Sequence, residues 1–572
     1  MGLITRQEVS KQFKLRRYSL QAAALQEVLS FVKRFEDDDP HEALDLLLDH
    51  LDQEPLKSSN LDKGTIDRVV AALLEVDEAS ASHSSSLWFV DAFVIPKFRY
   101  DPIKKIFYEC TGALPIHGNA HAKTALYRDR FELLSQRLSR NPHFSRPIFE
   151  SQSSSFGCCE IVPIQNLNWQ TGCRWIMGVI SQLEDGHYYL EDLTASVEVD
   201  LSSAISCYEG VIQWQTVNYA PSIKEITTGF FMENTIVVAE GEKLPNGIFK
   251  VNTCGFPPIE DREESLSFVG GLDFFGCGTF TNEETKRFAD MEKKAVNDMF
   301  VILSDIWLDE EETMAKLREV LEGYESVEVV PSLFILMGDF CSSPCSLSFH
   351  FFASLRSQFG KLGKMIAEFP RLKEHSRFLF IPSPDDAGPS SVLPRCALPK
   401  YLTEELQKEI PNALFMSNPC RIKFYSQEIV VFRRDLLYRM RRSCLIPPST
   451  AETSDPFAHL VATIIHQSHL CPLPLTVQPI SWNHDHCLHL YPTPHTIILG
   501  DRSEQKSFNY AGVTCFNPGS FSSAHTFVAY RPCTREVELS ALLCLRLEGW
   551  SSTLMQNDTL IEFDILNTFS YI

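Results

Sequence analysis

Acidic residues follow three separate apolar runs of this chain. Asp305, Asp339 and the pair Asp385 and Asp386 each lie a few residues beyond the end of such a run. The runs are typical of buried strands, and α/β enzymes place catalytic groups at the carboxyl ends of such strands. Carboxylate oxygens gathered there are suited to hard divalent cations. The sequence therefore predicts acids at one edge of a sheet.

These strand ends resemble those of the calcineurin-like metallophosphoesterases, whose motifs read Asp-x-His, Gly-Asp-x-x-Asp, Gly-Asn-His-Asp or Glu, and Gly-His-x-His. Asp305 and Asp339 match the first acids of two motifs. The other motif positions depart from the family pattern, and they are Trp307, Ser342, Pro384, Asp385, Asp386, Asp501 and Ser503. A two-metal site requires a bridging carboxylate and several imidazoles. The resemblance therefore implies an α/β layered phosphoesterase-like domain without its metal ligands, catalytic residues or cofactor.

The composition limits the classes of protein to which the chain can belong. Its 572 residues, 44% of them hydrophobic, suffice for roughly three or four domains. We find neither a membrane-spanning apolar run nor a secretory signal, so membrane attachment is not expected. The 17 cysteines then favour reduced thiols in the cytosol or nucleus. A net charge of -22 disfavours an extensive grip on duplex DNA or RNA by this chain alone.

Residues 1–76 carry the signals of helix starts. Thr5 and Glu8 form a capping-box pattern, and a second cap at Asp39 is followed by a first-turn proline. Apolar residues recur at helical spacing between and after these caps, which predicts a four-helix bundle. Residues 77–86 have almost nothing to bury, so we expect a flexible linker there.

The remaining chain predicts three further segments and a multidomain α+β protein. Residues 87–159 combine strands with a helix near 123–141, and we expect them to pack on the C-terminal core. Residues 160–258 read as short strands separated by turns, which is typical of an OB-type β-barrel. Residues 259–572 alternate strands with helices, as in an α/β layered domain.

The barrel segment contains aromatic residues that can stack on single-stranded nucleic acid, namely Trp169, Trp175, Tyr188 and Tyr189. They are interleaved with acids that repel a phosphate backbone: Glu184, Asp185, Glu191 and Asp192. Core packing or a protein contact is therefore the favoured interpretation of the aromatic residues.

Histidines cluster late in the chain. His484, His486 and His489 lie close together, with His466 and His469 nearby. We find no carboxylate or second cysteine at a spacing typical of zinc sites, so structural histidines are favoured.

The concentrated basic run spans residues 433–442 and contains five arginines. Such a run can touch nucleic acid or serve nuclear import. At helical spacing its arginines also lie near aromatic and acidic residues, so we favour a solvated helix face or a site for an acidic partner.

A helical module, an OB-like barrel and a phosphoesterase-like domain without ligands together resemble the B subunits of the replicative eukaryotic DNA polymerases. The segments that carry the resemblance, closest to the epsilon branch, are residues 127–138, 238–242, 336–340, 381–385, 418–421 and 468–474. The N-terminal bundle, similar to the helical lid of AAA+ ATPases, is a mark of that branch.

The resemblance implies a nuclear, non-catalytic accessory subunit that acts in chromosomal DNA replication. It implies binding to the zinc-containing C-terminal region of the DNA polymerase epsilon catalytic subunit. It also implies that residues 1–76 dock on the GINS part of the replicative helicase. Contact with DNA is expected to be weak or indirect.

Two alternatives remain open at this point. The first is an active phosphodiesterase or nuclease that holds one Mg²⁺ or Mn²⁺ between Asp305, Asp339, Asp385 and Asp386. The second is a single-strand-binding protein centred on residues 160–258, which the acidic balance of the chain disfavours.

Overall fold

The computed structural model describes residues 87–144, 160–169, 172–184, 186–202, 229–344, 349–388, 391–448 and 453–542, with a few positions between 12 and 61. The chain divides into two units, Met1–Ser86 and Leu87–Ile572. The first contains a parallel pairing of β1 (Ser19–Leu20) with β2 (Asn60–Leu61). Most of the segment predicted as a four-helix bundle, and all of the predicted linker, lie outside the described residues.

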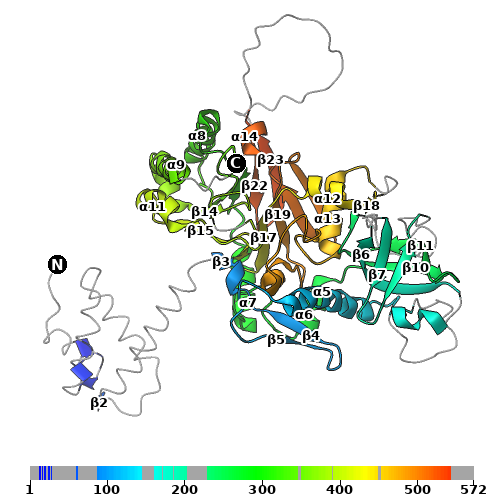
Figure 1. The fold of residues 1–572 in the computed structure, drawn as a ribbon. Helices are drawn as coiled ribbons and strands as arrows, with labels where there is room; N and C mark the ends of the chain where they lie inside the picture. The colour runs from blue at the N-terminus through cyan, green and yellow to red at the C-terminus, as the bar shows by residue number, and fades with distance from the viewer. Residues whose placement is uncertain are drawn as a thin grey trace, which may run out of the picture. The chain divides into compact units, whose positions relative to one another are not determined.

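A closed five-stranded barrel forms one part of the second unit (Figure 1). Its strand order is β10-β11-β8-β7-β6. The strands are β6 (Arg174–Glu184), β7 (His187–Glu191), β8 (Ser196–Asp200), β10 (Ile236–Lys243) and β11 (Phe249–Gly255). Successive side chains of a strand alternate between its two faces, and Ile176, Ile180 and Val237 are fully buried inside. The predicted barrel is therefore present.

The first of two six-stranded sheets carries the predicted acids. Its order is β15-β14-β13-β12-β22-β23. The strands are β12 (Phe300–Ser304), β13 (Leu333–Met337), β14 (Arg377–Ile381), β15 (Ala413–Phe415), β22 (Thr526–Arg531) and β23 (Glu536–Ala541). The first four are parallel to one another, β22 pairs antiparallel with β12, and β23 pairs antiparallel with β22. Every residue of β12 and β13 is buried, as expected for parallel strands covered on both faces.

The second sheet packs face to face against the first. Its order is β20-β21-β19-β17-β16-β3. The strands are β3 (Leu87–Asp91), β16 (Cys420–Phe424), β17 (Gln427–Arg433), β19 (Thr496–Gly500), β20 (Lys506–Tyr510) and β21 (Val513–Asn517). Ile302 and Ile335 of the first sheet share one core with Val431 and Ile498 of the second.

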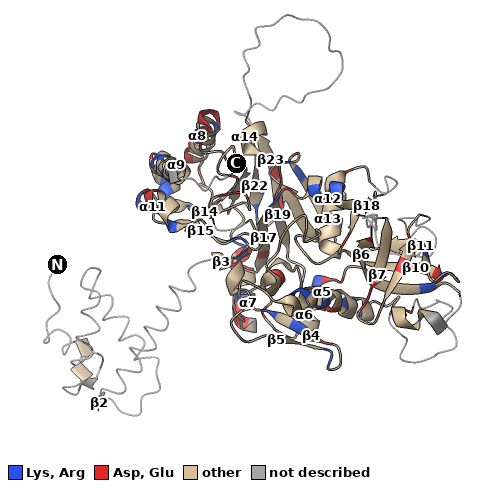
Figure 2. Cartoon of the chain, in the orientation of Figure 1, with Lys and Arg blue, Asp and Glu red and all other residues tan. Residues whose placement is uncertain are grey.

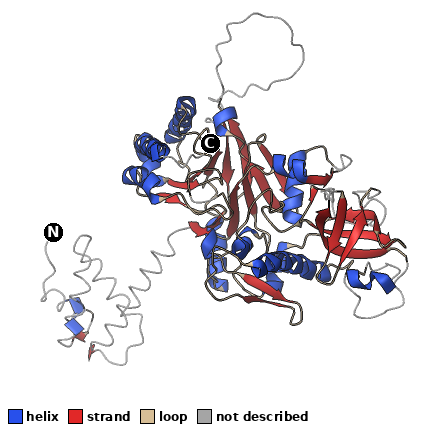
Figure 3. Cartoon of the chain, viewed as in Figure 1, coloured by secondary structure: helices blue, strands red, loops and turns tan. Residues whose placement is uncertain are grey.

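Helices cover the outer faces of both sheets, which gives four layers (Figure 3). The first sheet is covered by α8 (Glu311–Ser326), α9 (Phe349–Ala367), α10 (Pro370–His375) and α11 (Lys400–Glu409). The second is covered by α12 (Leu437–Ser443) and α13 (Pro456–His466). This arrangement is the α/β layered domain that the alternating elements predict.

Shorter elements connect these parts. They are η2 (Ala92–Val94), β4 (Phe98–Asp101), β5 (Ile106–Glu109), η3 (Ile164–Trp169), β9 (Phe231–Met232), α6 (Arg262–Val269), α7 (Asn282–Glu292), β18 (Cys444–Ile446), η4 (Trp482–Leu488) and α14 (Phe521–Ala524). The long helix α5 (Ala120–Arg140) begins at Asn119, whose side chain accepts a hydrogen bond from the Ala122 amide. Its apolar side packs on the barrel, and Arg130 and Arg137 on its buried surface bond to the layered domain.

None of the described helices combines the length and the hydropathy that crossing a bilayer requires.

Candidate functional site

The carboxyl ends of β12, β13 and β14 bring Asp305, Asp339 and Asp386 together. These strands are adjacent and parallel, so their ends meet at one edge of the sheet. Asp305 turns the chain with φ of 62°, a left-handed conformation. At Gly338 the backbone passes so close to Asp386 that a Cβ atom would lie 1.9 Å from its Oδ2. Glycine is therefore required there.

Hydrogen bonds from the protein itself use both carboxylate oxygens of Asp305. Oδ1 accepts from Trp307 Nε1 at 3.1 Å and from Arg502 at 3.2 and 3.0 Å. Oδ2 accepts from Ser520 Oγ at 2.5 Å and Ser522 Oγ at 3.2 Å. A metal ion at either oxygen would have to compete with these donors.

Asp339 is bonded to two arginines and a serine. Its Oδ2 accepts from Arg433 at 3.2 Å and from Arg502 at 2.5 Å, and its Oδ1 accepts a short hydrogen bond from Ser383 Oγ. Burial raises the pKa of this carboxyl, and the charges of Arg433 and Arg502 oppose the rise.

Asp386 holds the neighbouring turns in place through hydrogen bonds to both of its carboxylate oxygens. Its oxygens accept from the backbone amides of Phe340 and Ser383, each at 2.7 Å. Burial, together with the negative charge of Asp339, raises the pKa of Asp386 to about 7. The carboxyl thus joins the turns after β13 and β14.

Ser342, Asp385 and Pro384 lie near the cluster without contributing to its charge pairing. Ser342 turns away and donates to Asp309 from both its amide and its hydroxyl, at 2.9 and 2.7 Å. Asp385 is exposed and pairs with Arg434 at 3.0 Å, and Pro384 is buried between its neighbours.

Asp501 and Ser503, in the position of the histidine motif, hold nearby chain segments in place. Asp501 Oδ2 accepts from the amides of Leu436 and Leu437, at 2.5 and 2.9 Å, at the start of helix α12. Ser503 accepts from Asn517 Nδ2. Among the described residues, Asp501 and Ser503 therefore bond to neighbouring chain segments and not to the strand-end acids.

Arg433 and Arg502 are site residues that were not predicted from the sequence. The prediction that the run 433–442 forms a solvated helix face is wrong for Arg433 and Arg434, which are buried. Strand β17 ends at Arg433 and helix α12 begins only at Leu437, so helical spacing does not apply to the first arginines. The position of Arg502 in the sequence was the available signal, because residues 500–503 stand where the family has its histidine motif.

The histidine cluster contains a carboxylate that local sequence spacing did not reveal. His469, Asp485 and His489 offer ligand atoms that all lie within 4.8 Å of one another. The segment around 485 is a 3-10 helix, and its turn brings Asp485 beside His489.

The hydrogen bonds of this cluster do not suit a metal ion. His469 Nδ1 accepts from the Cys471 amide, so its Nε2 carries the proton and donates to Asp485. Arg130 binds both oxygens of Asp485, at 2.9 and 2.5 Å. Burial and the neighbouring Arg130 lower the pKa of His469 to about 3. These contacts fit the favoured interpretation of structural histidines.

Two of the barrel aromatics, Trp175 and Tyr188, also pack inside the protein. Trp175 is buried and contacts Phe144 with ring centroids 5.9 Å apart. Tyr188 and Tyr189 are half-buried, with Tyr188 against the barrel core. This packing favours a structural role for Trp175 over a stacking platform.

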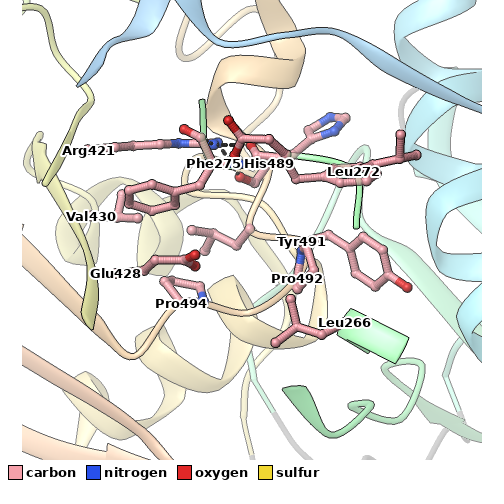
Figure 4. A pocket seen from close by; sticks show the side chains of 13 residues that line it. Leu266, Leu272, Phe275, Arg421, Glu428, Val430, His489, Tyr491, Pro492 and Pro494 are labelled. Carbon is pink, nitrogen blue, oxygen red and sulfur yellow. Dashed lines mark hydrogen bonds between the residues drawn. The ribbon is translucent and has the colours of Figure 1, made fainter. Parts of the chain in front are cut away.

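A separate cavity of about 50 Å³ lies between the loop after α6 and the second sheet (Figure 4). Arg421 on its wall is buried and donates to the carbonyl oxygens of Phe274, Phe275 and His489. Glu428 on the same wall pairs with Arg262 at 2.9 Å. These bonds hold helix α6 and neighbouring loops against β16 and β17, which explains the charged residues without a ligand.

Comparisons with known proteins agree with this architecture. The family model for the B subunit of DNA polymerases alpha and epsilon matches residues 300–509, and the model for the OB-fold domain of proteins like DNA polymerase epsilon subunit 2 matches residues 120–258. The B subunit of DNA polymerase epsilon from Arabidopsis thaliana is 63% identical over 541 residues, which cover 94% of this chain and 99% of the relative. DNA polymerase epsilon subunit 2 of Homo sapiens is 31% identical over 540 residues, which cover 93% and 97%. Because both alignments span nearly the whole of each protein, the chain belongs to the B subunits of DNA polymerase epsilon.

Proposed function

We propose that the chain is a non-catalytic scaffold in the nucleus. It binds the zinc-containing C-terminal region of the catalytic subunit and, through residues 1–76, the GINS part of the replicative helicase. The observation that carries the non-catalytic role is the state of the strand-end acids, whose oxygens are bonded to the protein's own arginines, serines and backbone amides. A hydrolytic metal site needs such oxygens for its ions.

Each predicted segment has its own binding function in this proposal. Residues 1–76 form the helicase-binding module and residues 77–86 its tether. Residues 87–159, the barrel at 160–258 and the layered region 259–572 form the body that binds the polymerase. Acidic and basic residues are interspersed along α8 and α11 (Figure 2), and a surface of mixed charge suits protein partners better than a phosphate backbone.

A co-purification experiment tests the scaffold role. The full chain and a variant lacking residues 1–76 are each mixed with the catalytic subunit's C-terminal region and, separately, with GINS. We expect both proteins to retain the polymerase region and only the full chain to retain GINS. Thermal unfolding of the shortened variant serves as the folding control. Failure of the full chain to bind the polymerase region would contradict the proposal.

Hydrolysis assays separate this role from that of a single-metal phosphodiesterase. The four acids of that alternative do not present a common set of free oxygens, because Asp385 pairs with Arg434 and Asp386 binds backbone amides. We expect no cleavage of bis-p-nitrophenyl phosphate by the full chain with Mg²⁺, Mn²⁺ or Zn²⁺. Metal-dependent cleavage that disappears in Asp339→Asn would contradict the proposal.

A further inference from the structure

We propose that Arg433 and Arg502 are the built-in cations of the strand-end acids and that Arg502 keeps divalent metal ions out of a latent site between Asp305 and Asp339. The inference deepens the proposed non-catalytic role and rests on it. It assigns to two arginines the electrostatic part that bound cations play in metal-dependent sites.

The two aspartates need positive charge at this position. The side chains of Asp305 and Asp339 are 2% and 10% exposed, and both accept a hydrogen bond from the same nitrogen of Arg502, at 3.0 and 2.5 Å. Two carboxylates this close and this buried repel each other and lose hydration, so they require cations within bonding distance. The two guanidinium groups meet that requirement.

Arg433 is the inner of the two cations. Its side chain is 1% exposed and lies 3.2 Å from Asp339 and 3.8 Å from Asp305. It also pairs with Asp435 at 2.8 Å and donates to the carbonyl oxygens of Gly338 and Gly500. Because these partners lie at or just after strand ends of both sheets, Arg433 is part of the core that joins the two sheets.

Arg502 is the outer cation and is removable. It lies in the loop after β19, and its side chain is 44% exposed. It also lines a cavity of about 80 Å³ with Asp339, Asp385 and Asp386. Truncation of Arg502 would therefore open a path from this cavity to the facing oxygens of Asp305 and Asp339 while Arg433 stays in place.

The oxygens that would be exposed select the class of ion. Asp305 Oδ1 and Asp339 Oδ2, the oxygens now bonded to Arg502, are hard ligands that favour Mg²⁺ or Mn²⁺. Zinc sites rely on imidazole or thiolate, whereas the described side chains that bond to the two aspartates carry guanidinium, indole and hydroxyl groups. The latent site would thus hold a single hard cation with several water ligands.

An anion site at Arg502 is the competing interpretation of an exposed arginine beside a cavity. The Nε and one terminal nitrogen of Arg502 already donate to Asp305, and the same terminal nitrogen donates to Asp339. The cavity is also lined by three carboxyl groups. A phosphate or carboxylate entering it would meet negative charge, so the cation interpretation is the stronger one.

Titration of the full-length protein with MnCl₂ tests the inference, with binding followed by calorimetry and by the Mn²⁺ electron paramagnetic resonance signal. We expect Arg502→Ala to bind one Mn²⁺ at least about tenfold more tightly than the wild-type protein does, since a competing unit charge has been removed. Arg502→Gln, which keeps most of the side-chain volume, serves as a second test if the alanine variant does not fold.

Three further variants define the site. Arg502→Lys retains a positive charge and should bind Mn²⁺ no better than the wild type. The double change Arg502→Ala with Asp339→Asn should lose the gained affinity. Arg318→Ala removes an arginine from a surface pair with Glu368 and serves as the matched control, for which no gain is expected.

Either of two results would overturn the inference: equal Mn²⁺ affinity of the wild type and Arg502→Ala, or absence of tighter binding in both the alanine and glutamine variants. Binding of the polymerase region is a separate readout. If the wild-type chain does not bind the polymerase region, the scaffold role is contradicted. The metal titrations alone decide the role of Arg502.

Discussion

Gly338 is the residue at which the packing of the site is tightest. A methyl group there would collide with Asp386 Oδ2 and lie 2.8 Å from the Ser383 amide, and these two groups are bonded to each other. We expect Gly338→Ala to lower the free energy of unfolding by about 3 kcal/mol, because the turn after β14 must move. Urea denaturation measures this change.

Gly360→Ala provides the control for that prediction. Gly360 lies in α9, where an added Cβ would be 3.3 Å from Glu405 Cβ, and alanine favours the helix by about 1 kcal/mol. We expect a net change within about 1 kcal/mol of zero. Equal losses in the two variants would show that Gly338 is not specially constrained.

At the residue scale, the acids were predictable and their partners were not. Asp305 and Asp339 follow apolar runs that predict strands. The carboxyl ends of adjacent parallel strands meet at one edge of their sheet, so the two acids are expected to lie close together. Arg433 and Arg502 come from the second sheet and the loop after it, more than 90 residues beyond Asp339. Only the tertiary packing of two sheets brings them to the acids, and local charge patterning carries no information about that packing.

At the scale of elements, a buried ion pair holds α5 against the layered domain. Arg130 and Asp485 are both buried, and Arg130 binds both carboxylate oxygens. We expect Arg130→Met to destabilise the protein by about 3–5 kcal/mol, because Asp485 would be left as a buried charge. Chemical denaturation of the full chain, followed by circular dichroism, gives this value.

A surface ion pair supplies the comparison for Arg130. Arg318 of α8 lies 2.5 Å from Glu368, but the two side chains are 41% and 54% exposed. Water screens this pair, so Arg318→Met should change the stability by no more than about 1 kcal/mol. If both methionine variants were equally stable, the buried pair would not be what holds α5.

Element types were easier to predict than their junctions. The barrel and the helices α7, α8 and α9 follow from alternation and helical spacing within single segments. The stretch 433–442 changes from strand to helix within four residues, and the segment 482–488 forms a 3-10 helix. Short segments of this kind contain too few residues for a period to be distinguished, so their geometry depends on packing.

At the scale of the whole molecule, buried histidines connect its parts. His486 donates to the carbonyl oxygen of Ile95, and His495 Nδ1 accepts from the Glu428 amide that precedes the β17–β19 pairing. His466 bonds to Pro257 and to Tyr510, and thereby links the chain after the barrel to the second sheet. Protonation of such residues would affect contacts between elements that are distant in sequence.

The acid stability of the whole protein follows from these histidines. Burial, with nearby cations, lowers the pKa values of His469, His486 and His495 to about 3. Between that value and the ordinary histidine pKa the unfolded chain binds more protons than the folded one, so stability is complete near neutral pH and is lost as the pH falls. The expected slope is about 1.4 kcal/mol per pH unit for each histidine. Asp386, whose pKa is raised to about 7, contributes a slope of opposite sign and offsets one histidine.

Replacing one of the three histidines tests this explanation of acid sensitivity. In His495→Gln the side-chain oxygen can still accept from the Glu428 amide, but the side chain no longer titrates. We expect the plot of unfolding free energy against pH between 6 and 4 to become shallower by about 1.4 kcal/mol per pH unit. His121→Gln, at an exposed position in α5, should leave the plot unchanged. An unaltered slope in His495→Gln would mean that His495 is not held neutral by the folded protein, and the acid sensitivity would then have to come from other buried groups.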